Sequence, residues 1–188
     1  IKLTNFDTMK DLIHDADQVI PKELVKMIWD KYYGKRSGNM TWDAQNYIRE
    51  KVKSLLNIIE DRRIDNFIFK SAPGYKGYYH ALYNKYFNDK MIDKALASKE
   101  YREINWDSYM MRICNITNEN RDLNALPGFM DIWNAFDLRN IGNIKSSEGA
   151  LEVAFKIFEI VESNLPKPEC SDQGDDVTSE DGQGGSDE

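Results

Sequence analysis

The fold of this chain is decided by residues 41–59, TWDAQNYIREKVKSLLNII. Apolar residues recur in this stretch every three or four positions, and most of the charged residues fall between them. The apolar positions are Ala44, Ile48, Val52, Leu55, Leu56 and Ile59. Because an α-helix turns once in about 3.6 residues, this spacing lines the apolar side chains along one face. The stretch therefore predicts a helix, capped by Thr41, that buries that face in a core.

Residues 147–165, SEGALEVAFKIFEIVESNL, repeat the same pattern near the other end of the chain. The inner face of this predicted helix consists of Leu151, Ala154, Phe155, Phe158, Val161 and Leu165. Ser146 or Ser147 is suited to cap its first turn, and Pro166 and Pro168 end it. Two long amphipathic helices of this kind can cover each other's apolar faces.

The segments between and before these helices also have helical spacing, and none alternates for long with the period of a strand. Thr4 is placed to cap an opening helix, and Ser98 to cap one that contains Trp106. Residues 71–74, Ser-Ala-Pro-Gly, break the chain before a helix that runs towards Ala97. The sequence predicts an all-α, multi-helix bundle over residues 1–165.

The acidic character of the chain belongs to its last segment. Residues 166–188 hold eight acidic residues and one lysine, whereas residues 1–165 hold equal numbers of acidic and basic residues. The last segment has one aliphatic residue, Val177, and no aromatic one. Burial cannot offset the entropy of ordering such a segment, so we expect residues 166–188 to form a disordered acidic tail.

The residue types that chemistry requires are scarce, and we expect no catalytic site, no cofactor and no metal. The two histidines, His14 and His80, are far apart, and the cysteines Cys114 and Cys170 have no metal-binding spacing. Cys114 lies between Ile113 and Ile116, which predicts a core thiol. No apolar run approaches the roughly 18 residues of a membrane span.

The exposed features that remain favour binding. Trp29 and Trp133 have apolar neighbours at helical spacing and are predicted in the core, whereas Trp42 lies beside a cap and is predicted at the rim. The run Gly34–Gly38 stops a helix and exposes Lys35 and Arg36. These three residues, Trp42, Lys35 and Arg36, are candidates for contact with a protein partner.

A second set of candidates lies where aromatic and basic residues alternate between positions 75 and 86. We take Tyr75, Lys76, Tyr79 and Lys85 as partner-binding candidates. The same mixture serves as a stacking platform for single-stranded nucleic acid, so a replication accessory protein with an acidic regulatory tail is the alternative. The neutral charge of residues 1–165 favours a protein partner over nucleic acid, and the oligomeric state stays open.

Two groups of residues resemble a known family. At Leu3-Thr4, Leu12-Ile13, Pro21, Leu24, Met27-Ile28-Trp29 and Met40 the chain resembles the opening of the Plasmodium helical interspersed subtelomeric (PHIST) domain. At Leu123, Leu126, Phe129, Ile132-Trp133 and Phe136 it resembles the late helix of that domain. The resemblance covers roughly residues 3–165. It departs from the family pattern at Tyr78–Phe87, where tyrosine and phenylalanine stand in place of a tryptophan.

The resemblance implies a non-enzymatic helical module that the malaria parasite exports into the red cell. Such modules bind host membrane-skeleton proteins or the cytoplasmic segments of parasite surface adhesins. An export signal would then lie upstream of Ile1. Without the resemblance, a cytoplasmic location is expected.

Removal of residues 169–188 tests the predicted division between bundle and tail. We expect the thermal midpoint of the truncated chain to equal that of the full chain, because the deleted segment buries no apolar surface. Differential scanning calorimetry of both chains measures this. A drop of several degrees would contradict the division, since it would require contacts between tail and bundle.

Overall fold

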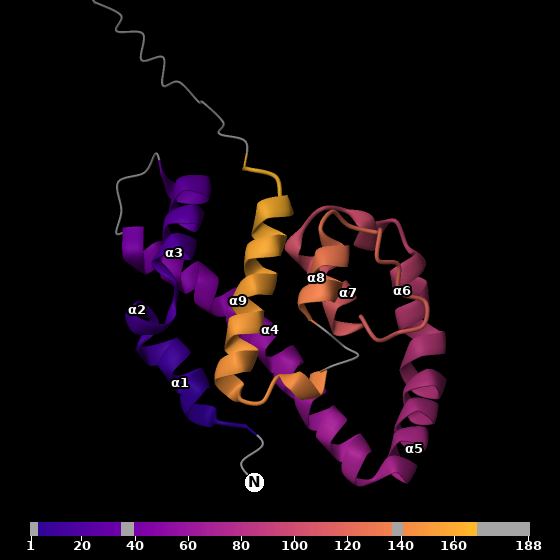
Figure 1. Ribbon diagram of the computed structural model, residues 1–188. Helices are drawn as coiled ribbons and strands as arrows, with labels where there is room; N and C mark the ends of the chain where they lie inside the picture. Colours follow the sequence, from indigo (N-terminus) through magenta and orange to yellow (C-terminus); the bar gives the residue numbers. More distant parts are fainter. Residues whose placement is uncertain (1–3, 35–39, 137–140, 169–188) are drawn as a thin grey trace, which may run out of the picture.

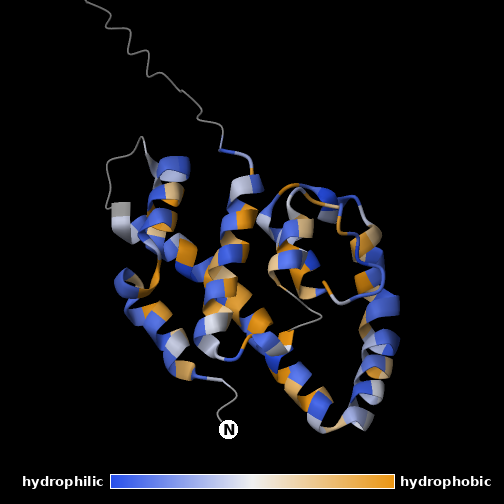
Figure 2. Cartoon of the chain, in the orientation of Figure 1, coloured by the Kyte–Doolittle hydropathy of each residue, from blue (hydrophilic) through white to orange (hydrophobic). Residues whose placement is uncertain are grey.

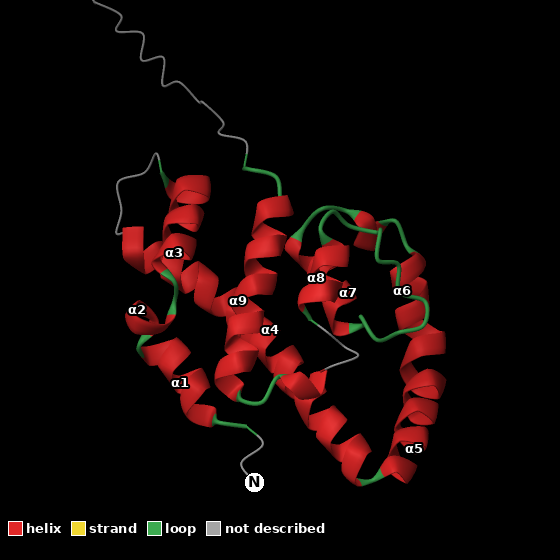
Figure 3. Cartoon of the chain, viewed as in Figure 1, coloured by secondary structure: helices red, strands yellow, loops and turns green. Residues whose placement is uncertain are grey.

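The computed structural model describes residues 4–34, 40–136 and 141–168, and all regular structure in these ranges is helical (Figures 1 and 3). The predicted all-α bundle is therefore confirmed. Lys35, Arg36 and residues 169–188 of the predicted tail lie outside the described residues. The α-helices are α1 (Phe6–His14), α2 (Ala16–Val19), α3 (Lys22–Ile28), α4 (Met40–Ser71), α5 (Pro73–Tyr83), α6 (Asp93–Ala97), α7 (Trp106–Cys114), α8 (Phe129–Ala135) and α9 (Ser147–Asn164).

Four shorter segments complete the helical structure. Two are π-helical, η1 (Trp29–Tyr33) and η2 (Asn84–Ile92), and each continues directly from the α-helix before it. Two are 3₁₀ turns, η3 (Glu100–Arg102) and η4 (Ile141–Asn143). The π-helical segments matter here because such segments are rare and are often found at functional sites.

The core forms where α4 crosses α9. The predicted apolar face of α4 is buried at every one of its six positions, and Ala154, Ile157, Phe158 and Val161 of α9 are fully buried as well. Figure 2 shows the hydrophobic residues of the two helices gathered at their crossing. Helices α1–α3 cover one side of this pair, and α7 and α8 lie on the other side of α9 (Figure 1). The apolar periodicity of residues 41–59 and 147–165 therefore predicted the two helices, α4 and α9, that form the centre of the bundle.

Helix boundaries depend on local hydrogen bonds, and several predicted caps were wrong. Asn5 rather than Thr4 caps α1, and Asn105 rather than Ser98 caps α7; each asparagine accepts a backbone N–H of the first turn. Thr41 lies inside α4, which begins at Met40. Ser146 caps α9 as predicted, accepting the N–H of Gly149 at 3.1 Å.

Three of the four tryptophans are half-buried against the core, including Trp29 and Trp133, which were predicted as core residues. The guanidinium of Arg121 lies over the ring of Trp133, 4.6 Å from its centroid. Trp42 is 62% exposed, which confirms its predicted place at the rim. The predicted core thiol is wrong: Cys114 is exposed at the last residue of α7, where its helix face turns to solvent.

One glycine is required by the backbone. Gly128 precedes α8 with φ +69°, a left-handed conformation that favours glycine. A Cβ at this position would lie 2.4 Å from Nδ2 of Asn164 at the end of α9. The close approach fixes α8 against the last turn of α9.

The carboxylate of Glu162 lies inside the bundle, and its side chain is fully buried. It accepts hydrogen bonds from Lys31 Nζ at 2.9 Å, Tyr32 Oη at 2.9 Å, Tyr47 Oη at 2.6 Å and Trp106 Nε1 at 2.8 Å. These donors come from η1, α4 and α7, so one side chain of α9 joins three other elements.

The surroundings of Glu162 show the electrostatic cost of this arrangement. Burial, followed by the neighbouring Glu162, raises the pKa of Tyr47, and burial also raises the pKa of Tyr32. Both phenols therefore stay protonated and act as donors. Lys31 is itself nearly buried, at 9% exposure, and supplies the compensating positive charge. A buried charge is tolerated only when such partners satisfy it.

A second buried charge ties α6 to α7. Arg112 is 1% exposed, and it donates from Nε to the Tyr101 carbonyl at 2.7 Å and from Nη2 to the Leu96 carbonyl at 3.1 Å. Burial lowers the pKa of its guanidinium, and the nearby Arg102 acts in the same direction. The arginine holds the end of α6 and the turn after it against α7.

Removal of the Glu162 carboxylate tests its role in the fold. Glu162→Ala leaves Lys31 as a buried unpaired charge, and we expect a loss of about 3–5 kcal/mol in the free energy of unfolding. Tyr47→Phe removes one donor and should cost about 1–3 kcal/mol. Urea unfolding followed by circular dichroism measures both.

Glu159→Ala, on the exposed face of the same helix, is the matched control and should change stability by less than about 0.5 kcal/mol. Equal effects of Glu162→Ala and Glu159→Ala would show that the buried network contributes nothing specific.

Candidate protein-binding surface

Residues Pro73–Ala97, comprising α5, η2 and α6, form one long helix at the outer edge of the molecule, which we call the aromatic helix (Figure 1). It folds back from the end of α4 because Ala72 has a non-helical backbone and Pro73 begins a new helix. Its first turns contact α4, and its last turns adjoin η3. Between these ends it leaves large side chains in solvent.

The exposed side chains of the aromatic helix are mostly apolar or aromatic. Tyr78 is 82% exposed, Met91 61%, and Tyr75, Leu82 and Tyr86 are each 51% exposed. Isolated exposed apolar residues are ordinary, but several along one helix make that helix a candidate interaction surface. These exposed side chains contribute little to the core, so the stability of the fold does not explain why they are apolar.

Three rings of the aromatic helix form a ladder along it, and the first of them, Tyr79, also contacts α4. Tyr79 lies 4.6 Å from Tyr83, and Tyr83 lies 5.1 Å from Phe87, measured between ring centroids. At the base, Phe69 of α4 contacts Tyr79 at 5.3 Å and Tyr75 at 6.5 Å. These distances suit favourable ring pairs, so the ladder anchors the helix to α4 through Phe69.

Basic residues flank the outer aromatic side chains. Lys85 and Lys90 both approach the ring of Tyr86, with their Nζ atoms 5.3 and 5.7 Å from its centroid. Both lysines and Tyr86 belong to the π-helical segment η2. The outer face therefore presents aromatic rings and positive charges together.

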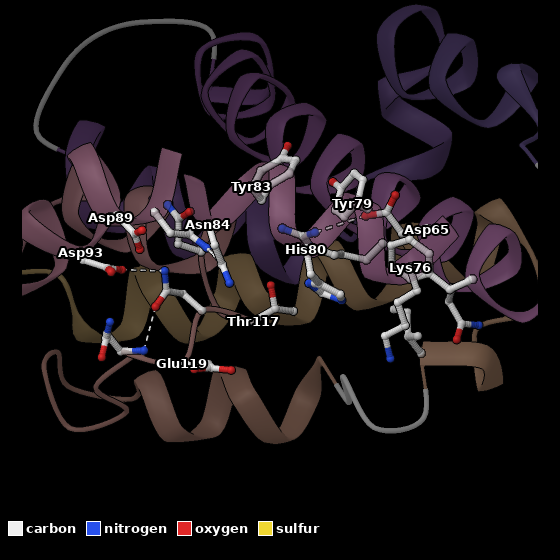
Figure 4. Close-up of a pocket in the computed structure, with 18 residues that line it drawn as sticks. Asp65, Lys76, Tyr79, His80, Tyr83, Asn84, Asp89, Asp93, Thr117 and Glu119 are labelled. Carbon is white, nitrogen blue, oxygen red and sulfur yellow. Dashed lines mark hydrogen bonds and ion pairs between the residues drawn. The ribbon is translucent and has the colours of Figure 1, made fainter. Parts of the chain in front are cut away.

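A cleft of about 430 Å³ lies beside the inner face of the aromatic helix (Figure 4). The second half of α4 forms one wall, the aromatic helix another, and residues 115–120 after α7 close the third side. Tyr79 and Tyr83 contribute their rings, while the loop contributes asparagine, threonine and glutamate side chains. Its size is within the range of sites that take a small molecule or a peptide side chain.

The cleft has two differently charged ends. Figure 4 shows Asp89, Asp93 and Glu119 toward one end and Lys76 toward the other. Asp93 accepts a hydrogen bond from Asn118 Nδ2 at 2.9 Å. Asp89 and Glu119 have no hydrogen-bond or ion-pair partner among the described residues. The acidic end therefore holds uncompensated negative charge.

At the other end, one of the two basic side chains, Arg62, is already paired. Arg62 forms an ion pair with Asp65 at 3.3 Å and donates from Nη2 to the Cys114 carbonyl at 2.8 Å. Burial, together with a hydrogen bond to Tyr83, raises the pKa of Tyr79, which stays protonated. Lys76 has no ion-pair partner in the part of the chain that the structure describes.

Four of the seven predicted partner-binding residues lie on the aromatic helix. Tyr75, Lys76 and Tyr79 belong to α5 and Lys85 to η2; of these, Lys76 and Tyr79 line the cleft. Trp42 is in the first turn of α4, and the helix that separates it from Ala72 is about 45 Å long at 1.5 Å per residue. Trp42 therefore belongs to a different surface.

The sequence interpretation missed the acidic end of the cleft. Asp89, Asp93, Asn118 and Glu119 are not among the residues that the sequence singled out as binding candidates. The polar composition of residues 115–124 was the available signal. Only the fold brings this loop opposite the aromatic helix.

Other kinds of site find no support among the described residues. They contain no group of three or more metal-binding side chains. No helix in the same ranges is both long enough and apolar enough to cross a membrane. Comparison of the chain with protein-family models, with curated proteins and with solved structures found no match.

Phe69→Ala tests how the aromatic helix is held. We expect faster deuterium uptake over residues 73–92 and a loss of about 1–2 kcal/mol in the free energy of unfolding, because the ladder loses its base. Hydrogen exchange followed by mass spectrometry measures the uptake. Phe67→Ala is the control, since Phe67 is 40% exposed and makes none of these ring contacts. Equal uptake in the two variants would mean that the ladder does not anchor the helix.

Proposed function

We propose that this chain is a non-enzymatic protein-interaction module that binds its partner through the outer face of the aromatic helix. The observation that carries the proposal is the row of exposed side chains Tyr75, Tyr78, Leu82, Tyr86 and Met91. Tyrosine and methionine are enriched in protein interfaces, and tyrosine is among the residues that contribute most to binding. A partner would cover this row without any change in the bundle.

The geometry of the helix supports this function. Its ring ladder links successive turns of the helix and contacts α4 through Phe69, which favours an ordered arrangement of the exposed side chains before binding. A surface that is already ordered loses less entropy on association than a flexible one. The π-helical segment η2 at its centre is a further feature typical of functional sites.

The partner class comes from the PHIST resemblance. We propose that the chain is exported into the red cell and binds membrane-skeleton proteins or the cytoplasmic segment of a surface adhesin. The fully helical bundle suits such a module, although many unrelated proteins share that architecture. In a cell without such partners, we expect the same face to bind a cytoplasmic protein.

Binding to inside-out red-cell membrane vesicles and to an immobilised adhesin cytoplasmic segment tests the proposal. We expect Tyr78→Ala/Tyr86→Ala to weaken binding at least about tenfold, because each substitution removes an exposed aromatic anchor. The thermal midpoint should stay unchanged, since neither ring is buried. Sedimentation of vesicles with labelled protein measures the affinity.

Phe6→Ala is the matched control, because Phe6 is 72% exposed on α1 at the opposite side of the bundle. Trp42→Ala tests the separate surface at the start of α4. Equal affinity of the wild type and the double variant would reject the aromatic helix as the binding face. A wild-type chain that binds neither preparation would reject the red-cell partner class.

One observation favours the alternative, a nucleic-acid accessory protein. Lys85 and Lys90 lie close to Tyr86 on the exposed face. In proteins that bind single-stranded nucleic acid, aromatic rings stack on the bases and basic side chains neutralise the phosphates. Against it, the adjoining cleft carries more carboxylates than cations. Titration with a labelled thymidine oligonucleotide at several salt concentrations separates the two functions, because phosphate binding weakens steeply with salt.

A further inference from the structure

The acidic end of the cleft has the charge to receive a positive group. Asp89 and Glu119 are unpaired among the described residues, and Asp93 shares its carboxylate with one neutral donor only. A lysine or arginine that enters here meets several carboxylates from two elements, η2–α6 and the loop after α7. Hydrogen bonds between ionised groups of this kind are roughly twice as strong as those between neutral groups.

The aromatic wall suits the same guest. The rings of Tyr79 and Tyr83 line another wall of the same cleft, with Tyr79 toward the end that holds Asp65 and Lys76 (Figure 4). A cation held over a ring face gains electrostatic energy from the ring, and the methylene groups of lysine or arginine gain apolar contact. One cleft thus combines the two features that recognise a long basic side chain.

The remaining lining matches a peptide backbone. Six asparagines contribute to the cleft: Asn66, Asn84, Asn88, Asn115, Asn118 and Asn120. A carboxamide is both donor and acceptor, like the peptide group, and can pair with an extended chain. The side chains of Asn66 and Asn120 make no hydrogen bond to another described residue, so they are available to a guest.

From these observations, and on the basis of the proposed function, we propose that the cleft binds an extended segment of the partner protein that carries lysine or arginine. The basic side chain contacts Asp89, Asp93 and Glu119, and the backbone pairs with the side chains of Asn66 and Asn120. The outer face of the aromatic helix then binds a second part of the same partner. Phosphate groups and the acidic segment 166–188 are disfavoured guests, because the acidic end of the cleft repels them.

Selection from a phage-displayed library of random peptides tests the proposal on the full chain at physiological ionic strength. We expect the recovered peptides to contain more lysine and arginine than the unselected library. Affinities of the synthesised peptides, measured by fluorescence polarisation, should fall at least about tenfold with Asp89→Asn/Glu119→Gln, because both unpaired carboxylates are removed.

Glu152→Gln/Glu159→Gln is the matched control. It removes the same charge from exposed positions of α9 and should change peptide affinity by less than about twofold, since surface charges away from the site are screened. This control also accounts for attraction of basic peptides to the acidic segment, which all variants share. Thermal melting of both double variants checks that the fold is unchanged.

The proposal is overturned if no peptide is recovered, if the recovered peptides show no excess of basic residues, or if both double variants weaken binding equally. These outcomes do not decide the proposed function, which is tested by substitution of Tyr78 and Tyr86. Neither of these residues lines the cleft. Loss of red-cell binding in Tyr78→Ala/Tyr86→Ala alone, with Asp89→Asn/Glu119→Gln unaffected, would retain the interaction module and reject the cleft as its peptide site.

Discussion

The buried carboxylate of Glu162 and its donors set the arrangement of the elements around the α4–α9 pair. A charge removed from water must be satisfied by the protein, and here four side chains from η1, α4 and α7 satisfy it. Apolar packing alone would let the helices slide or rotate with modest loss. A hydrogen-bonded carboxylate with fixed donors specifies one registration of the four elements, and the position of α7 in turn fixes the loop that closes the cleft.

The central helices could be predicted from the sequence because their apolar residues repeat with the helical period. All six predicted positions of α4 are buried, and the inner face of α9 is correct at Leu151, Ala154, Phe158 and Val161. Glu162 could not be predicted as a buried residue, since a glutamate beside Val161 looks like the solvent edge of the stripe. Its burial depends on Lys31, Tyr47 and Trp106, which approach from distant parts of the chain.

The candidate site was accessible to sequence analysis only in part. Local composition identified Tyr75, Lys76, Tyr79 and Lys85 as unusual, because aromatic and basic residues alternate there. Periodicity cannot decide which side of such a helix faces a core, since Tyr78 and Tyr79 have the same chemistry and opposite environments. The acidic end of the cleft joins residues about 30 positions apart, and no short-range signal links Asp89 with Glu119.

The attachment of the aromatic helix at both ends has a mechanical consequence. Phe69 holds its base through the ring ladder, and Arg112 holds its far end through the carbonyls of Leu96 and Tyr101. A helix fixed at one end would peel away when a bound partner pulls on it, with contacts breaking in sequence. A helix fixed at two ends shares the load between them, so both anchors must yield together. Residues 73–97 are therefore braced against the bundle at both ends, which resists their separation from it under load.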